Sequence, residues 1–310
     1  MTYFPSGAQY ELNGSGYSAA VTAIGASLRC LRWRDRDLIV PFGPGELRPN
    51  FRGAVLAPWP NRVVNGRYTF AGIDHQLPLT EPERGHALHG LALWLNSEVI
   101  DRGPSRVMLE MVIEPQNGYP FRVRVVVTYE LDSTGLRTNV EATNLSDCTA
   151  PFATAPHPYL VAPQGQLDEW TLSLPASTVL AVTPDRLIPI KLVPVDQLDN
   201  GAMDFRVPRE IGSTKIDHAF TELSPDDVGI TSVTLTDRSD RGVRMSWGKS
   251  SPWVQIHTAD LPSPGTNRLG LAVEPMSGPP DAFNSSLDVP CLSPGEVVRA
   301  EWRIGVIEPT

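Results

Sequence analysis

Two side chains that lie far apart in the sequence are of the types needed for acid–base chemistry. Glu274 ends the apolar run 271–274, which has the composition of a buried strand, and a carboxylate is costly to bury unless the protein uses it. His157 lies between Pro156 and Pro158, which restrict the backbone around its imidazole. A carboxylate and an imidazole together can take and give protons near neutral pH, as general acid–base catalysis requires. At this stage, pairing of Glu274 with a surface arginine and a purely structural role for His157 remain alternatives.

An arginine in a proline-rich loop is a further candidate for ligand binding. Asn61 and Arg62 follow the segment Ala57-Pro58-Trp59-Pro60. A guanidinium in such a loop can donate paired hydrogen bonds to hydroxyl or carboxylate groups, and it can equally stack on Trp59. Composition alone favours neither arrangement.

Two histidines have a spacing that occurs in metal sites. His86 and His89 are three residues apart, which would suit a metal ion if the segment were helical. Glycines on each side favour a loop instead, and no third ligand is evident nearby. We therefore expect no metal site here, and the chain has no zinc-protease, nucleotide-binding or serine-hydrolase motif.

Polar residues at 217–218 and in the predicted strand 253–258 complete the candidates. Asp217 and His218 are adjacent, so on a strand they would point in opposite directions and could not form a direct dyad. In the alternating run 253–257, Gln255 and His257 lie on the same face, opposite to the apolar residues between them. One residue of the Asp217–His218 pair could therefore face a cleft.

Alternation of apolar and polar residues dominates the chain and predicts β-strands. Over residues 121–131 the odd positions are all apolar and the even positions are mostly polar or charged. This pattern is typical of a strand with one face in a core and the other in water. The same alternation occurs over 107–113 and 298–304. Further strands are expected at 18–24, 136–142, 171–181, 230–236, 243–247, 253–258 and 269–274.

Proline and glycine separate these segments. The chain has 30 prolines and 25 glycines, which disfavours long helices and favours many turns. Many strands without intervening helices predict an all-β protein built as a large antiparallel β-sandwich or barrel. No shift in composition divides residues 1–310, so we expect a single domain. Loops are expected at 41–49, 184–194 and 262–265, with a turn at 117–120.

Charge and cysteine content bound the location and partners. The 310 residues carry a net charge of −9 at pH 7, which argues against nucleic acid and anionic membranes as partners. The N-terminal ten residues lack the features of a signal peptide, and no apolar run approaches the ~18–20 residues that a membrane helix needs. The three cysteines, Cys30, Cys148 and Cys291, are widely spaced, so we expect mostly buried, reduced thiols in a cytoplasmic protein.

Eight short motifs follow one another in a specific order. They are Gly25-Ala26, Pro60-Asn61-Arg62 with Gly66, Leu88-His89-Gly90, Gly118-Tyr119-Pro120-Phe121, His157-Pro158-Tyr159, Asp217-His218-Ala219-Phe220, Gln255, and Val273-Glu274-Pro275. In these motifs the chain resembles the aldose 1-epimerase (galactose mutarotase) family over roughly residues 16–304. Each motif alone is weak, and their order makes the resemblance specific. Leu91 and Leu160 depart from the glycine and the aromatic residue that are commoner in the family.

The resemblance implies a galactose mutarotase-like β-supersandwich with a sugar cleft. It also implies an isomerase that interconverts the α- and β-anomers of a free aldohexose such as glucose or galactose. Glu274 would be the base that takes the proton from the C1 hydroxyl, and His157 the acid that protonates the ring oxygen. Their proximity would favour an ionised Glu274 and a protonated His157. The implied substrate-binding residues are Asn61, Arg62, His89, Asp217 and Gln255.

The same resemblance implies no cofactor and a sugar as the small-molecule partner of a monomer or homodimer. Other functions remain open. A non-catalytic sugar-binding protein would need neither Glu274 nor His157, and a hydrolase would need a second carboxylate, for which Asp217 is the only plausible residue. A hexose-6-phosphate 1-epimerase would need extra cations facing the cleft. The cations available are Arg52, Arg84, Lys215, Lys249 and Arg268.

Overall fold

Three antiparallel sheets make up most of the computed structural model, which describes residues 4–309. The largest sheet has nine strands. In spatial order they are β10 (Glu98–Arg102), β11 (Arg106–Ile113), β12 (Val123–Asp132), β13 (Gly135–Asn144), β27 (Val297–Ile307), β23 (Gly242–Trp247), β22 (Thr231–Thr236), β17 (Thr171–Ser173) and β20 (Arg209–Glu210). The last strand of the chain, β27, therefore lies in the middle of this sheet, between β13 and β23.

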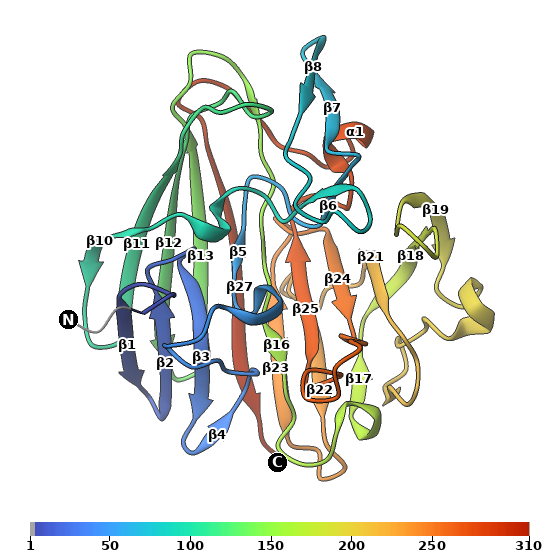
Figure 1. The fold of residues 1–310 in the computed structure, drawn as a ribbon. Coiled ribbons are helices and arrows are strands. Elements are labelled where there is room, and N and C mark those ends of the chain that lie inside the picture. The colour runs from blue at the N-terminus through green and yellow to red at the C-terminus, as the bar shows by residue number, and fades with distance from the viewer. Residues whose placement is uncertain (1–3, 310) are drawn as a thin grey trace.

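Two smaller sheets pack against the nine-stranded one. Figure 1 shows the four-stranded sheet beside β10–β13, and contacts of β1 and β2 with β11–β13 join these layers. Its strands are β1 (Gln9–Gly14), β2 (Tyr17–Thr22), β3 (Ser27–Trp33) and β4 (Arg36–Asp37). The six-stranded sheet has the order β16 (Tyr159–Leu160), β25 (Leu271–Met276), β24 (Trp253–His257), β21 (Asp217–Leu223), β18 (Ala176–Val182) and β19 (Pro189–Pro194).

The predicted alternation matches the buried faces of the long strands. In β11, Val107, Leu109, Met111 and Ile113 are buried, and the residues between them are partly exposed. In β12 and β27 the buried positions alternate in the same way along most of the strand. Apolar side chains from the large sheet and from the inner faces of the two smaller sheets share one hydrophobic core. The prediction of an all-β protein with a large antiparallel sandwich is confirmed.

Two segments differ from the predicted pattern. The single strand expected at 171–181 is two strands, β17 in the nine-stranded sheet and β18 in the six-stranded sheet. Pro175 lies at the break, where its missing N–H and fixed φ favour a change of direction. The loop expected at 184–194 contains β19, an edge strand that begins and ends with proline, as edge strands tolerate.

Short elements connect the sheets. The two-stranded pairs are β5 (Val55–Leu56) with β15 (Ala155–Pro156), β6 (Arg62–Val64) with β9 (His86–Leu88), β7 (Arg67–Phe70) with β8 (Ile73–Gln76), and β14 (Ala150–Pro151) with β26 (Cys291–Leu292). The helices are α1 (Ala282–Ser285) and the 3₁₀ turns η1 (Pro49–Phe51), η2 (Ala92–Trp94), η3 (Leu167–Glu169) and η4 (Leu198–Gly201). Within residues 4–309, no helix has the length and apolar character needed to span a membrane.

The cysteines correct one expectation. All three are free, but Cys148 and Cys291 are exposed and only Cys30 is partly buried. Cys148 follows a strand in a surface turn, and Cys291 lies at the start of the two-residue strand β26. The prediction of mostly buried thiols was therefore wrong, because it relied on the average burial of cysteine rather than on the position of each residue.

Candidate active site

A cavity of about 230 Å³ is lined by side chains of β21, β24 and β25 and by several connecting loops. Strands contribute to one wall, and the loops around residues 50, 61, 81, 89 and 157 contribute to the others. All seven site residues expected from the sequence line this one cavity. They are Asn61, Arg62, His89, His157, Asp217, Gln255 and Glu274.

Three neighbouring strands place four polar side chains on one face of the six-stranded sheet. Gln255 of β24 pairs directly with Glu274 of β25, and Asp217 of β21 pairs with His257 of β24. Because side chains alternate along a strand, these four point to the cavity while the apolar residues between them enter the core. The Gln255 amide nitrogen donates a hydrogen bond to Asp217 Oδ1 at 2.7 Å. The strand register thus brings together residues from distant parts of the chain.

His157 is held from both sides in the link between β15 and β16. Its backbone N–H donates to the Ala54 carbonyl at 2.9 Å, and its carbonyl accepts from the Gly53 N–H at 2.8 Å. Its ring packs against those of His89 and Tyr159, with centroids 5.0 Å and 5.3 Å away. These contacts fix the orientation of the imidazole at the cavity wall.

Glu274 and His157 face each other within this cavity. His157 Nε2 lies 3.4 Å from Glu274 Oε1, and the two side chains are only 5% and 2% exposed, His157 first. Burial, reinforced by nearby Asp217, raises the pKa of Glu274 well above its usual range. Burial, reinforced by nearby His257, lowers the pKa of His157 to about 3. These shifts run against the expectation that pairing favours an ionised Glu274 and a protonated His157, because removal from water favours the neutral form of each group.

Arg62 binds a carboxylate and does not depend on Trp59 for its position. Its Nε donates to Glu81 Oε2 at 2.8 Å and its Nη2 donates to Glu81 Oε1 at 3.0 Å. Arg84 Nη1 also donates to Glu81 Oε1, at 2.9 Å. Asn61 adopts a φ of 53°, which asparagine tolerates better than most residues. Its Oδ1 accepts the backbone N–H of Arg62 at 3.0 Å.

A tight turn directs His89 into the cavity and separates it from His86. His89 and Gly90 have φ values of 64° and 79°, and a β-carbon at Gly90 would lie 2.1 Å from the Ala57 carbonyl oxygen, so glycine is required. Burial lowers the pKa of His89 well below its usual range. His86 lies in β9, where a loop was expected, and its Nε2 is 2.9 Å from the Arg186 carbonyl oxygen. Among residues 4–309, no three His, Cys, Asp or Glu side chains are arranged to hold a metal ion.

Several buried polar atoms at the cavity have no hydrogen-bond partner within the part of the chain that the structure describes. Buried polar groups are normally paired, so unpaired ones at a cavity indicate where polar groups of a ligand can bind. Hydroxyl groups both donate and accept, and they match this mixture of nitrogens and oxygens. The unpaired atoms are Arg84 Nε, His89 Nδ1, His157 Nδ1, Gln255 Oε1, His257 Nδ1 and Glu274 Oε2.

Glu81 and His257 also line the cavity and were not among the predicted site residues. His257 Nδ1 lies 3.8 Å from Asp217 Oδ1. The alternation of residues 253–257 already placed His257 on the face of Gln255, so the sequence contained a usable signal. Glu81 had none, because it lies in a turn and its contact with Arg62 spans 19 positions.

The cations considered for phosphate binding lie in different places. Arg84 lines the cavity, whereas Lys215 and Arg268 line a neighbouring depression. Arg268 is already paired with two carboxylates there. Arg52 is buried beneath Tyr159 and Lys249 is exposed in a turn. Of these five residues, only Arg84 could reach a ligand in the cavity.

Comparisons with known proteins agree with this architecture. The family model for aldose 1-epimerase matches residues 8–305. The chain is 34% identical to the uncharacterized protein YihR of Escherichia coli K12 over 300 residues, which is 96% of this chain and 93% of that protein. It is 28% identical to galactose mutarotase of Mus musculus over 224 residues, covering 66% of this chain and 62% of that protein.

Solved structures share the fold. The aldose epimerase homologue from C. elegans has a TM-score of 0.83 at 20% identity, over 96% of this chain and 99% of that one. Galactose 1-epimerase from Lactobacillus acidophilus has a TM-score of 0.78 at 20% identity, over 96% and 95%. Since the family model spans nearly the whole chain, and the fold agrees with it, this protein belongs to the aldose 1-epimerase family.

Proposed function

We propose that the protein is an aldose 1-epimerase that interconverts the α- and β-anomers of a free aldohexose such as glucose or galactose. One observation carries this proposal: a carboxyl and an imidazole lie 3.4 Å apart in a cavity where several other buried polar atoms have no protein partner within residues 4–309. Galactose mutarotases among the relatives support a hexose substrate. A cavity of about 230 Å³ is smaller than the ~300–1,000 Å³ typical of sites for drug-sized ligands, which favours a single sugar ring.

The proposed reaction is two proton transfers around one hemiacetal. Glu274 takes the proton of the C1 hydroxyl while His157 gives a proton to the ring oxygen, and the C1–O5 bond breaks to leave an open-chain aldehyde. Rotation about C1–C2 presents the other face of the carbonyl to the O5 hydroxyl. Ring closure then reverses both transfers, so the enzyme returns to its starting protonation state. Each such group typically contributes ~10²–10⁴ in rate.

The pKa shifts indicate which of the two groups holds the shared proton before the reaction. Because burial raises the pKa of Glu274 and lowers that of His157, burial favours the form of the pair in which one shared proton lies on Glu274 and the imidazole is neutral. The catalytic form has the same number of protons, with the proton on His157. Transfer from Glu274 Oε1 to His157 Nε2 across 3.4 Å produces the carboxylate base and the imidazolium acid. The pair is therefore one proton-sharing unit rather than two independent groups.

The remaining residues would hold the ring so that C1 and O5 face this pair. Arg62 and His89 are hydrogen-bond donors, Asp217 is an acceptor, and Asn61 and Gln255 offer both functions. Asp217 suits an acceptor role because nearby His257 and Arg62 outweigh the effect of burial and hold its pKa below its usual range. It therefore stays ionised and can accept hydrogen bonds from sugar hydroxyls.

A sugar with an anionic substituent is the second candidate, and Arg84 is the observation in its favour. The Arg84 side chain is 39% exposed, and its Nε has no partner among the described residues. Four carboxyl groups line the same cavity, however: Glu81, Asp217, Asp260 and Glu274. The charges of Glu81 and Asp217, whose pKa values are held below their usual range, oppose a phosphate dianion, so a neutral aldohexose is preferred.

Polarimetry of freshly dissolved α-D-glucose and α-D-galactose tests the proposal, in a buffer that itself catalyses mutarotation weakly. Faster relaxation with the wild type, lost in both Glu274→Gln and His157→Asn, supports the reaction and the assigned pair. Glucose 6-phosphate is measured in parallel, and acceleration of this sugar alone would favour the anionic substrate. Binding of sugar by calorimetry without acceleration of any of the three would instead indicate a non-catalytic sugar-binding protein.

A further inference from the structure

We propose that Glu81 is a positioning residue for the epimerase reaction, which holds the Arg62 guanidinium in place and balances its charge beside the reacting carboxyl. This inference rests on the proposed function and adds to it a residue that does not itself contact the reacting atoms. The group formed by Glu81, Arg62 and Arg84 is called the Glu81 clamp.

The geometry of the clamp is that of a rigid two-point contact. Arg62 donates to both oxygens of Glu81, at 2.8 Å and 3.0 Å, and the two side chains are only 9% and 11% exposed. Such a fork fixes the plane of the guanidinium as well as its distance. Although burial acts to raise the pKa of Glu81, its hydrogen bonds and charge interactions with Arg62 and Arg84 hold that pKa below its usual range. Glu81 is therefore an anion under ordinary conditions.

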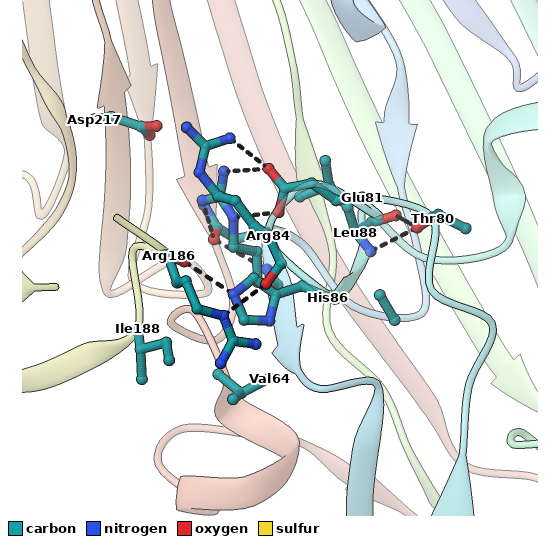
Figure 2. A network of polar contacts seen from close by, with 12 residues as sticks. Val64, Thr80, Glu81, Arg84, His86, Leu88, Arg186, Ile188 and Asp217 are labelled. Atoms are coloured by element: carbon teal, nitrogen blue, oxygen red, sulfur yellow. Dashed lines mark hydrogen bonds and ion pairs between the residues drawn. The ribbon is translucent and has the colours of Figure 1, made fainter. Parts of the chain in front are cut away.

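The turn that carries Glu81 is itself fixed. The Glu81 backbone N–H and carbonyl bond to the His86 carbonyl and the Gly85 N–H, which closes the turn. Figure 2 shows Arg84 reaching Glu81, and Arg186 reaching the backbone of Arg84, where Arg186 Nε donates to the carbonyl at 2.8 Å. The segment before β19 is thus tied to the cavity wall. An exposed salt bridge on a mobile loop would have none of these supports.

The charge of Arg62 acts directly on the site. It lowers the pKa of Asp217 and opposes the rise in the pKa of Glu274. The anion of Glu81 screens this effect, because it lies against the same guanidinium. The titratable or charged groups that face Glu274 are Arg62 of β6, Asp217 of β21, His257 of β24, and His157 and Tyr159 in and beside the link to β16.

Two effects should follow when Glu81 loses its charge. First, glutamine leaves only one acceptor oxygen for the fork, beside the longer contact of Arg62 Nη1 with Asn61 Oδ1 at 3.3 Å. The plane of the guanidinium is then no longer fixed, and sugar binding weakens. Second, the charge of Arg62 acts on Glu274 without screening, so the pKa of Glu274 falls. Misplacement of a positioning group typically costs up to ~10²-fold in rate. We therefore expect kcat/KM to fall by about 10- to 100-fold, mainly through KM, with the alkaline limb of activity moved to lower pH.

The test compares Glu81→Gln with Glu114→Gln in the mutarotation assay across pH. Glu114 is a matched control, since Arg122 binds it with the same two-point geometry, at 2.9 Å and 3.0 Å, on an exposed surface where the two side chains are 60% and 48% accessible. The control should match the wild type. Glu81→Asp keeps the negative charge on a shorter side chain. Compared with Glu81→Gln, it should return the alkaline limb close to that of the wild type while KM stays raised.

Folding and function are separated by a second variant and a binding measurement. If Glu81→Gln does not fold, Arg62→Lys removes the fork and keeps the positive charge, and it should reproduce the rise in KM while leaving the alkaline limb in place. An active wild type whose folded Glu81→Gln variant keeps KM within twofold and the same alkaline limb would overturn the clamp alone. A folded wild type that neither accelerates mutarotation nor binds sugar by calorimetry would overturn the proposed function, and the clamp with it.

Discussion

Replacing His157 with asparagine should change how stability depends on pH. In the folded protein, burial holds the pKa of His157 at about 3, whereas a histidine in an unfolded chain titrates near ~6.5. Between these values the unfolded state binds a proton that the folded state does not, so this residue lowers the stability of the wild type as the pH falls. Asparagine does not titrate, and the variant should lack this component.

The size of the effect follows from the two pKa values. For a single group, each pH unit below the pKa of the unfolded chain lowers the free energy of unfolding by about 1.4 kcal/mol, as long as the pH stays above the folded pKa. Between pH 7 and pH 5, the free energy of unfolding of the wild type should therefore fall by about 2 kcal/mol relative to His157→Asn. The titrating groups that do not contact His157 are present in both proteins and cancel from this difference. The packing cost of the substitution adds the same offset at each pH.

Urea unfolding at pH 7, 6 and 5, followed by tryptophan fluorescence, measures the difference directly. His157→Gln provides a control for packing, since it should have a different offset and the same change with pH. Curves for the wild type and the variants that stay parallel across this range would refute the reasoning. They would mean that His157 has the same pKa in the folded protein as in the unfolded chain, so that its interaction with Glu274 offsets the effect of burial.

Three further predictions concern other parts of the molecule. Glu274→Gln should gain stability relative to the wild type as the pH rises from 5 to 8, because the folded carboxyl keeps a proton that the unfolded chain releases; denaturant titration at the two pH values measures this. Gly90→Ala should lower the melting temperature far more than Gly72→Ala, since both have positive φ but only Gly90 has backbone within reach of a β-carbon. A thiol reagent should label Cys148 and Cys291 quickly in the native protein and Cys30 slowly, and equal rates for all three would contradict their described exposure.

Sequence periodicity predicted most long strands of the nine-stranded sheet and two strands of the cavity wall, β24 and β25, but it did not predict β1, β3, β10 or β21. Because a strand has only two faces, alternation predicts directly that Gln255 and His257 lie on the same face, and it predicts which face of β11 is buried. The prediction failed at Pro175, where one apolar segment forms two strands that belong to different sheets. The alternation within a segment does not indicate which other strand it pairs with. The order of the strands within each sheet depends on contacts between distant parts of the chain, so the pattern of a short segment cannot predict it.

The loop residues of the cavity were predicted less completely. The resemblance to the family included Arg62 and His89, whereas Glu81 became visible only when a turn and β6 were placed side by side. The protonation of Glu274 and His157 was also beyond the sequence, because it depends on how completely the surrounding layers exclude water. Residue type suggested the proposed chemistry, and the pKa directions that bear on its protonation came from the depth of burial.

The central position of β27 has a consequence for how the chain reaches its folded form. Until this strand is synthesised, β13 and β23 each have an open edge, and the halves of the nine-stranded sheet cannot join. Chains leave the ribosome N-terminal end first, so the edges of β13 and β23 stay unpaired until β27 has been made. During this time they can pair with strands of neighbouring molecules. Folding is therefore expected to be slow and sensitive to protein concentration. Low expression temperature and dilute refolding should raise the soluble yield.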